Sequence, residues 1–380
     1  MFPFGNYFRG DGGTVGRGGN ALGESGVSVW CLLGRKAGDN TQVRALAGAL
    51  GWGYEEKTVV AKSSELLVHI GHRATLAGIR RGASSAFEPP WPDLVLTAGR
   101  RNEPVAQWIR RESGGRTRLV HLGRPWTPLS RWDLIITTPQ YFLPEADNIL
   151  HNSLPLHGTS EDVLEQAVHS WQRRFQRLPR PWIAVLAGGD SGRYVLTPEK
   201  GRRLGELASG MANAADGALL VTDSPRTPPE ASRALEVALS APNFCYRFGR
   251  RGNNPYHGLL ALADAFIVTG ESMSMLAEAV DRGKPLFIFD PGDGATPWWK
   301  LGHNYRYKPL SHRLAMRLGP RRMRRDIGRI QASLVDSGRA QWLVKGARLD
   351  PGQSGATAPG SAREELARSA EAVRRLVTPR

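Results

Sequence analysis

Residues 265–290, AFIVTGESMSMLAEAVDRGKPLFIFD, form the segment that most narrows the fold of this chain. Two short apolar runs rich in β-forming residues, AFIVTG and PLFIFD, enclose a polar turn and a helical segment. This pattern predicts two parallel strands joined by a helix. Ser272 is expected to cap that helix, because its hydroxyl can accept a hydrogen bond from an exposed backbone N–H.

The same segment has the features of a ligand site. A helix that starts just beyond a parallel strand presents N–H groups and the positive end of its dipole to an anion. Glu278 follows Ser272 by six residues, nearly two turns into the helix. Its carboxylate can accept hydrogen bonds from the vicinal hydroxyls of a sugar. The segment is therefore interpreted as one that holds a molecule with both a phosphate and a sugar.

Apolar strands alternate with helices along most of the chain. The pattern predicts an α/β fold with two Rossmann-like domains, a cleft between them, and parallel sheets covered by helices on both faces. Strands are expected at 28–33, 93–99, 118–123, 133–139 and 148–152, and again at 182–189, 218–224, 243–249, 265–270 and 285–290.

Stretches rich in glycine and proline divide the chain into parts. Pro179 and Pro181 mark the boundary between the two α/β sets. The C-terminal helix can fold back across the domain junction or remain a solvated terminus. The expected parts are a disordered Gly-rich leader at 1–26, a first domain at 27–178, a second domain with a basic tail at 179–345, a flexible linker at 346–361 and a helix at 362–380.

The net charge is +16, from 51 basic and 35 acidic residues. Such a balance attracts polyanions, and anionic membrane surfaces are favoured over nucleic acid because no base-reading motif is found. The alternative is a solvated surface in an arginine-rich protein. The arginine cluster that carries this interpretation consists of Arg313, Arg317, Arg321, Arg322, Arg324, Arg325 and Arg329.

No apolar run approaches the roughly 20 residues that span a bilayer, and the leader has no apolar signal segment. Cys31 and Cys245 are expected to be free thiols of a reducing compartment. We therefore expect a cytoplasmic protein that is peripheral on the inner face of the cytoplasmic membrane.

Three polar loops of the second half directly follow predicted strands, so they are expected to converge on one pocket. Glycine-rich 188–192 can cradle a diphosphate with its backbone amides, or be a tight turn that needs positive φ. Ser224 and Arg226 can contact a phosphate or a base edge. The candidate ligand residues of these loops are Gly188, Gly189, Ser191, Ser224, Arg226, Glu271, Ser272, Ser274 and Glu278.

Loops of the first half face the same cleft. Asp39 is the best general base available, since it would project into the cleft at a helix start; alternatively Asp39 or Asn40 only caps the helix. Arg100 and Arg101 can bind an acidic acceptor, balance charge near a diphosphate, or be a surface pair. The cleft candidates on this side are Lys36, Gly38, Asn40, Arg100, Arg101 and Gln140.

Motifs of several other enzyme classes are missing from the sequence. The loop at 34–40 is not a Walker loop, and no G-x-S-x-G elbow supports a hydrolase. No histidine, cysteine or D-x-D spacing typical of a metal site occurs. We expect no cofactor and no metal, with a nucleotide sugar as the substrate.

Six sequence blocks occur in the order typical of one known family: LLGRKAGDNTQ, LTAGRRNEP, TTPQYFLP, VLAGGDSGRY, VTDSPRTP and TGESMSMLAEAVDRGKP. Over residues 27–308 the chain resembles the mitochondrial-fission-type (ELM-like) family, whose members are similar to GT-B glycosyltransferases. The resemblance implies a nucleotide-sugar domain at the C-terminal side, an acceptor domain at the N-terminal side and no metal requirement. It places Lys36, Gly38, Asp39, Arg100 and Arg101 on the acceptor or catalytic side.

The function expected from residues and resemblance is transfer of a sugar from a nucleoside diphosphate to a hydroxyl. The acceptor is expected to be an envelope glycan or a lipid-linked molecule, with Asp39 as the base. One alternative is a non-catalytic scaffold that keeps the fold and acts at a membrane surface, as the family's named plant members suggest. Another is a nucleotide-sugar epimerase.

Overall fold

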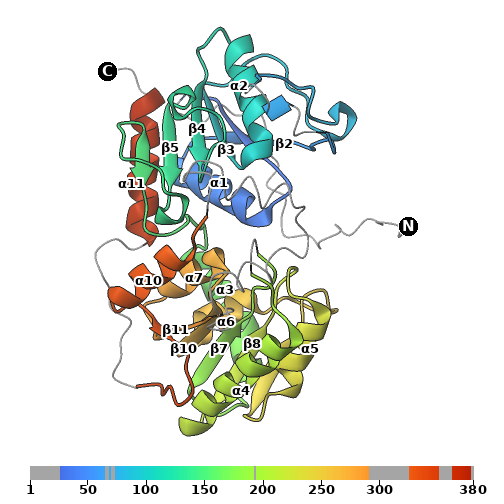
Figure 1. The fold of residues 1–380 in the computed structure, drawn as a ribbon, viewed down its shortest axis with the longest axis vertical. Coiled ribbons are helices and arrows are strands. Elements are labelled where there is room, and N and C mark those ends of the chain that lie inside the picture. The colour runs from blue at the N-terminus through green and yellow to red at the C-terminus, as the bar shows by residue number, and fades with distance from the viewer. Residues whose placement is uncertain are drawn as a thin grey trace.

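A computed structural model describes residues 26–64, 68–69, 73–191, 194–290, 325–350 and 362–377. The predicted leader lies outside these ranges except for Gly26, as do residues 351–361 of the predicted linker. Of the arginine cluster, only Arg325 and Arg329 are described. Two parallel six-stranded sheets flanked by helices form two Rossmann-like lobes, as the alternating pattern predicts (Figure 1).

The first lobe contains the strands β1 (Val29–Leu33), β2 (Tyr54–Thr58), β3 (Leu94–Ala98), β4 (Arg118–Leu122), β5 (Leu134–Thr137) and β6 (Ile149–His151). Their order in the sheet is β2-β1-β3-β4-β5-β6, and all pairs are parallel. Strand β2 was not predicted from the sequence, because YEEKT is a polar and largely exposed edge strand without an apolar run.

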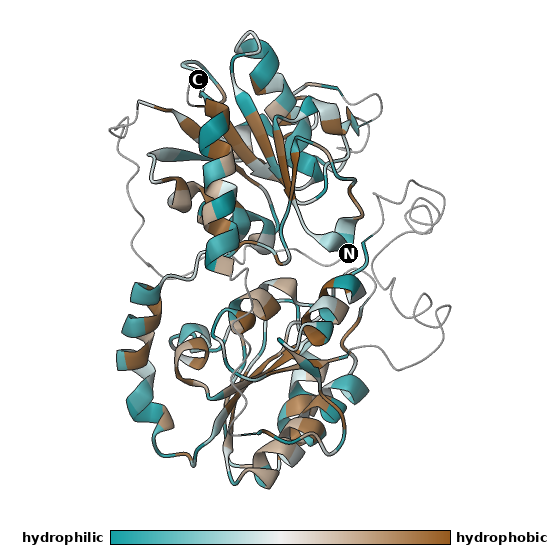
Figure 2. Cartoon of the chain, turned by 90° about the vertical axis from the view of Figure 1, so that its left-hand side faces the viewer, coloured by the Kyte–Doolittle hydropathy of each residue, from teal (hydrophilic) through white to brown (hydrophobic). Residues whose placement is uncertain are grey.

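Helices cover both faces of this sheet. On one face α1 (Ala37–Leu50) and α11 (Ala362–Val377) pack over the core around Leu46 and Leu96, and on the other α2 (Glu103–Glu112) packs around Ile109. Figure 2 shows the hydrophobic strands in the interior of each lobe, between helices with hydrophilic outer faces. Short 3-10 turns follow several strands: η2 (Arg81–Ala83), η3 (Arg100–Asn102), η4 (Leu129–Arg131) and η5 (Pro139–Tyr141).

The second lobe contains β7 (Trp182–Leu186), β8 (Ala218–Thr222), β9 (Asn243–Tyr246), β10 (Ala265–Thr269), β11 (Leu286–Phe289) and β12 (Gln341–Trp342). Their order is β12-β11-β10-β7-β8-β9. The fully buried strands β7 and β10 form the centre, which explains why they are continuous apolar runs. The helices are α3 (Glu161–Phe175), α4 (Pro198–Ala214), α5 (Pro229–Val237), α6 (Tyr256–Leu262), α7 (Met273–Val280) and α10 (Gly328–Asp336).

Helix α3 packs on the second lobe although it precedes the two prolines. Its Leu164, Trp171 and Phe175 are buried in the same core as Phe266 of β10. Ser160 caps the helix by accepting a hydrogen bond from the Val163 N–H at 3.4 Å. The segment that crosses between the lobes therefore precedes α3, whereas the predicted domain boundary at 178/179 follows it.

Helix α11 returns from the second lobe to the first, where it lies beside α1 (Figure 1). The buried carboxylate of Glu365 accepts hydrogen bonds from the backbone N–H groups of Ser153 at 2.6 Å and Leu154 at 3.3 Å. The Asn152 amide donates to the hydroxyl of Ser369 at 3.0 Å. The C-terminal helix therefore folds back over the domain junction, one of the two alternatives that the sequence left open.

We expect Glu365→Ala to lower the free energy of unfolding by about 1–3 kcal/mol, because two backbone N–H groups lose their acceptor in a buried place. Urea denaturation followed by tryptophan fluorescence measures the change. The matched control is Glu371→Ala on the same helix, an exposed residue whose surface pair with Arg375 contributes about 0.5 kcal/mol or less. Equal effects of the two substitutions would contradict this role of Glu365.

Candidate functional site

The strand order reverses at one point in each sheet. Chain order runs outward from β1 to β2 on one side and to β3 on the other, and likewise from β7 to β8 and to β10. In doubly wound sheets, ligands bind in the crevice beyond the carboxyl ends of the strands at such a reversal. The loops that follow β1, β3, β7 and β10 contain most of the residues that the sequence analysis selected.

The glycine turn after β7 is held by the turn after β10. Gly188 N–H donates to Thr269 Oγ1 at 2.7 Å, and Gly189 N–H donates to Glu271 Oε1 at 2.6 Å. Gly189 has φ +130°, and a Cβ there would lie 2.3 Å from the Arg226 carbonyl oxygen. A glycine is therefore needed at this position. Both amides already have protein acceptors, so the expected diphosphate cradle from these amides is not formed in this conformation.

Glu271 is the centre of this arrangement and is only 1 % exposed. Its Oε1 also accepts a hydrogen bond from Thr269 Oγ1 at 2.9 Å. Burial raises the pKa of the Glu271 carboxyl above its ordinary value, although the Gly189 N–H and the positive charge of Arg226 act in the opposite direction. Its Oε2 has no hydrogen-bond partner among the described residues.

The loop after β8 closes on the same turn. Ser224 is buried, and its hydroxyl donates to the Gly188 carbonyl and accepts from the Arg226 N–H at 3.2 Å. The Arg226 guanidinium donates to the Asp190 carbonyl at 3.4 Å and to the Ser272 hydroxyl at 3.3 Å. Ser224 thus fixes the loop, and Arg226 is the cation that the loop presents to the turn after β10.

The structure corrects the expected cap of α7. Ser272 precedes the helix, but its hydroxyl makes no capping bond and instead accepts from Arg226. Its backbone at φ −95° and ψ 82° differs from the extended geometry typical of an N-cap. The capping role was therefore wrong, although the predicted start of the helix is right.

Three predicted residues lie apart from these Arg226 contacts: Ser191, Ser274 and Glu278. Ser191 exchanges backbone hydrogen bonds with Tyr194 at 2.9 Å. Ser274 faces the first lobe, because a Cβ on Gly38 would lie 3.4 Å from its hydroxyl.

Glu278 is bound within the protein. Its carboxylate accepts from the Thr159 hydroxyl at 3.0 Å and from the Tyr256 hydroxyl. Thr159 belongs to the segment that crosses between the lobes. A sugar that binds Glu278 would therefore compete with these two hydroxyls.

In the first lobe, α1 begins at Ala37. Asp39 thus lies in the first turn, with its Oδ2 3.6 Å from Lys36 Nζ and 2.8 Å from where a Cβ of Gly99 would be. Gly99 has φ +78°, so only a glycine suits this approach. Asn40 does not cap α1, since its amide group exchanges two hydrogen bonds with the backbone of Gly34 at 3.0 and 2.8 Å.

Asn102 is a site residue that the sequence analysis did not select. It is 2 % exposed, and its amide donates to the carbonyl oxygens of Leu32 at 3.0 Å and Ala98 at 3.1 Å. It therefore joins β1 to β3 at the strand reversal. The signal for it was its place at the end of a strand-end loop, beside the two arginines.

The arginines after β3 lie beside aromatic residues. The Arg100 guanidinium stacks 4.5 Å from the centre of the Trp126 ring, and Arg124 lies 5.5 Å from that of Tyr141. Arg101 is exposed. These side chains give this end of the first sheet a positive rim.

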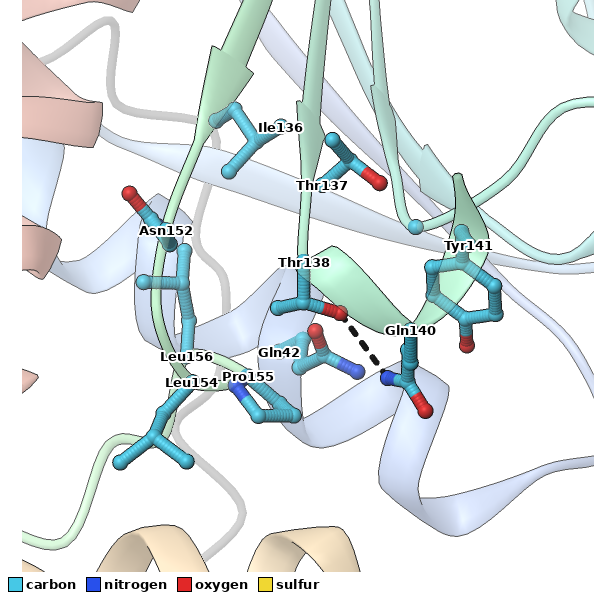
Figure 3. A pocket seen from close by; sticks show the side chains of 11 residues that line it. Gln42, Ile136, Thr137, Thr138, Gln140, Tyr141, Asn152, Leu154, Pro155 and Leu156 are labelled. Carbon is cyan, nitrogen blue, oxygen red and sulfur yellow. Dashed lines mark hydrogen bonds between the residues drawn. The ribbon is translucent and has the colours of Figure 1, made fainter. Parts of the chain in front are cut away.

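Gln140, one of the predicted cleft residues, is buried, at 2 % exposure. Its amide donates to the Thr138 hydroxyl at 2.9 Å, as Figure 3 shows, and its Oε1 accepts from Arg325 at 2.8 Å. It borders a small hollow at the carboxyl ends of β5 and β6 that contains no charged side chain. The hollow is lined by Gln42, Gly123, Ile136, Thr137, Thr138, Gln140, Tyr141, Asn152, Leu154, Pro155 and Leu156.

Glu103, at the start of α2, and His121, in β4, form a buried titratable pair in the first lobe. Both are 0 % exposed, and Glu103 Oε1 lies 3.8 Å from His121 Nε2. Burial raises the pKa of Glu103 to about 7, against hydrogen bonds from the Thr127 and Trp126 N–H groups. Burial lowers the pKa of His121 to about 3. Both groups are therefore neutral over much of the acidic range.

No group of three or more His, Cys, Asp or Glu side chains in the described part of the chain is placed to hold a metal ion. Among the described helices, none is both long and apolar enough to cross a membrane.

The family model described as mitochondrial fission ELM1 matches residues 37–307. The chain belongs to the mitochondrial fission ELM1 family. The match begins at the first residue of α1 and includes the loops after β3, β7, β8 and β10, so the strand reversal of the second sheet lies wholly within the part that the family shares.

Two proteins are similar to this chain over more than half of its length. The chain is 27 % identical over 237 residues to "Mitochondrial fission protein ELM1" of Arabidopsis thaliana, covering 57 % of this chain and 55 % of the plant protein. It is 24 % identical over 306 residues to the uncharacterized protein RP120 of Rickettsia prowazekii (strain Madrid E), covering 70 % and 84 %. The match thus spans just over half of the plant protein's length.

Solved structures similar to this chain include MurG of Acinetobacter baumannii, with a TM-score of 0.42, 12 % identity and 92 % of each chain covered. A UDP-GlcNAc 2-epimerase from Methanocaldococcus jannaschii has a TM-score of 0.47 and 10 % identity, with 92 % of this chain and 99 % of that chain covered. Sequence identities and scores this low do not assign an activity to the ELM1-family chain.

Glu103 and His121 are expected to make the free energy of unfolding depend on pH in opposite directions, so that their effects cancel in part. Between pH 4.5 and about 7, folded Glu103 retains a proton that the unfolded chain releases, so its contribution to stability falls as pH rises. Between pH about 3 and 6.5, the unfolded chain binds a proton at His121 that the folded protein does not, so stability rises with pH.

His121→Phe should remove the rise of stability with pH that His121 causes and leave the fall that Glu103 causes. We expect the stability of this variant to fall by up to about 1.4 kcal/mol per pH unit from pH 5 to 6.5, relative to the wild type. Urea midpoints across this range measure it, and Glu103→Gln should change the slope in the opposite direction. An unchanged profile in both variants would show that these groups do not titrate as buried residues.

Proposed function

We propose that this chain is a glycosyltransferase that moves a sugar from a nucleoside diphosphate to a hydroxyl of an envelope glycan or lipid-linked acceptor. The observation that supports it most is the approach of the two strand reversals. Gly38 in the first turn of α1 faces Ser274 in the first turn of α7, so both helix starts border one cleft. Arg226 lies on one side of that cleft and Asp39 on the other.

The second lobe supplies the donor side in this proposal. Arg226 and the N-terminal turn of α7 offer positive potential to a diphosphate. The cluster around Glu271 is internally hydrogen-bonded, so these groups are held before a ligand arrives. Preorganised charge of this kind stabilises a leaving diphosphate without reorganisation during the reaction.

The first lobe supplies the acceptor side. Asp39 is half-buried and is the proposed base for the acceptor hydroxyl. The hollow beside Gln140 offers amide, hydroxyl and aromatic groups, which suit the hydroxyls and apolar faces of a sugar. Arg100 and Arg101 suit an acceptor that carries negative charge.

Binding of a nucleoside diphosphate is the first expected outcome. A thermal-shift and calorimetric panel of UDP, GDP, ADP, CDP and dTDP should find one that stabilises the chain, by about 2.7 kcal/mol at a concentration 100 times Kd. Arg226→Gln should weaken that binding by about tenfold, because one charge-assisted hydrogen bond is lost. Failure of every nucleotide and nucleotide sugar to bind the wild type would sink the proposal.

Asp39→Asn is expected to lower the turnover of sugar transfer by about 10²-fold or more with little change in donor Kd, since only the base is removed. Rates with the responsive donor and a panel of glycan and lipid-linked acceptors measure this. Asp147→Asn, at an exposed aspartate, is the control. Conversion of the donor sugar without any acceptor would indicate an epimerase instead.

A second candidate, a non-catalytic scaffold at a membrane surface, has its own support. The Gly188 and Gly189 amides are bound to protein acceptors, and Glu278 is bound to Thr159 and Tyr256. A family named for mitochondrial fission also fits a role in recruitment. Glu278→Ala separates the two candidates: lost nucleotide binding supports the transferase, and changed partner recruitment with unchanged nucleotide binding supports the scaffold.

A further inference from the structure

The segment that leads into α10 joins the two lobes beside the cleft. The Gln331 amide donates to the Gly270 carbonyl at 2.6 Å, which ties α10 to the turn that contains Glu271. Six residues earlier, Arg325 Nε donates to Gln140 Oε1 of the first lobe at 2.8 Å, and the Asp326 N–H donates to the Gln140 carbonyl at 2.9 Å. Residues 325–331 therefore touch both sides of the proposed site.

Contacts with η5 strengthen this junction. Arg329 donates to the Pro139 carbonyl at 3.3 Å, and its guanidinium lies 4.8 Å from the centre of the Phe142 ring. The two described members of the predicted surface cluster, Arg325 and Arg329, are thus engaged with the first lobe. The role of the whole cluster at a membrane surface stays a prediction, since its other members lie outside the described residues.

Gln140 fixes the position of Arg325. The glutamine is 2 % exposed, its own amide donates to Thr138, and its Oε1 points to Arg325. Within the described ranges, Gln140 is the only hydrogen-bond partner of the Arg325 side chain and takes its Nε. The fork of two Nη groups, which matches the oxygen spacing of a phosphate, is left for another acceptor.

Arg226 and the segment that contains Arg325 both contact the turn after β10, since Arg226 donates to Ser272 at 3.3 Å and Gln331 donates to Gly270 at 2.6 Å. Burial is the main reason why the pKa of Arg226 is lowered, and the positive charge of Arg325 lowers it further, against the carboxylates of Glu271 and Asp190. The Glu271 oxygen that forms hydrogen bonds is already used by Gly189 and Thr269. A guanidinium bound to this turn and a second one on the segment tied to the same turn suit a multivalent anion.

We propose that Arg325 is a phosphate-binding residue of the donor site and that its bond to Gln140 couples phosphate binding to the approach of the two lobes. The inference rests on the proposed function, which supplies the diphosphate. Arg226 and Arg325 would bind it from opposite sides, and neutralisation of their repulsion would stabilise the contact between the lobes. Arg325 would then link the donor phosphate to the first lobe through Gln140.

Calorimetry on the full chain with inorganic pyrophosphate and the nucleoside diphosphate panel tests this role. We expect Arg325→Gln to weaken both kinds of ligand by about tenfold or more, as loss of a charge-assisted fork predicts. Arg325→Lys keeps the charge without the fork and should bind with intermediate affinity. Gln140→Ala should weaken binding by about threefold, because the guanidinium loses its support while its charge remains.

The matched control is Arg202→Gln, which removes one positive charge from an exposed pair with Glu206 on α4. It should leave both affinities within about twofold of the wild type, because an exposed charge that contacts no phosphate is largely screened by salt. The uncharged nucleoside of the responsive nucleotide should bind the wild type and Arg325→Gln equally. Thermal midpoints of all variants identify any that unfold, and Arg325→Lys then provides the comparison.

The outcomes separate this inference from the proposed function. Wild-type affinity for pyrophosphate and nucleotide in both Arg325 variants overturns the inference and leaves the transferase standing. Binding of pyrophosphate that depends on Arg325, without binding of any nucleotide, supports the anion site and overturns the transferase. If Arg325→Gln only reduces binding to vesicles with anionic lipid, the residue belongs to a membrane surface and the inference is wrong. A wild type that binds neither ligand overturns both.

Discussion

The buried carboxylate of Glu271 holds together the loops at the carboxyl end of the second sheet. It accepts the Gly189 N–H, and it occupies the space beside Gly188, where a Cβ would lie 2.1 Å from its Oε1. Ser224 and Thr269 complete the same network through Gly188. These hydrogen bonds join the loops after β7, β8 and β10 into one network.

Polar contacts join the two lobes at several described places. Three of these places are the approach of Gly38 to Ser274, the bond between Gln140 and Arg325, and the bond between Thr159 and Glu278. Polar junctions of this kind permit domain motion more readily than large apolar ones. Each place includes a residue that the sequence selected for ligand binding, so a ligand in the cleft would act on the junctions themselves.

Much of the fold could be predicted because its signals are local. Central strands such as β7 and β10 are buried on both faces and therefore appear as apolar runs, whereas the polar edge strand β2 has no such signal. The strand-end loops were found by their place after these runs. The roles within the loops were harder to predict: Asn40 binds Gly34, and Ser272 does not cap α7, because each side chain takes whichever partner the folded loop brings near.

The sequence by itself determined the parallel α/β architecture, the family and the positions of the strand-end loops, since hydrophobic period and turn chemistry act over a few residues. Only the tertiary structure decided which polar groups pair. Gln140 meets Arg325 across 185 residues of sequence, and Thr159 meets Glu278 across 119. Such pairs depend on how two separately patterned lobes pack together, and a buried polar group accepts whatever donor that packing supplies.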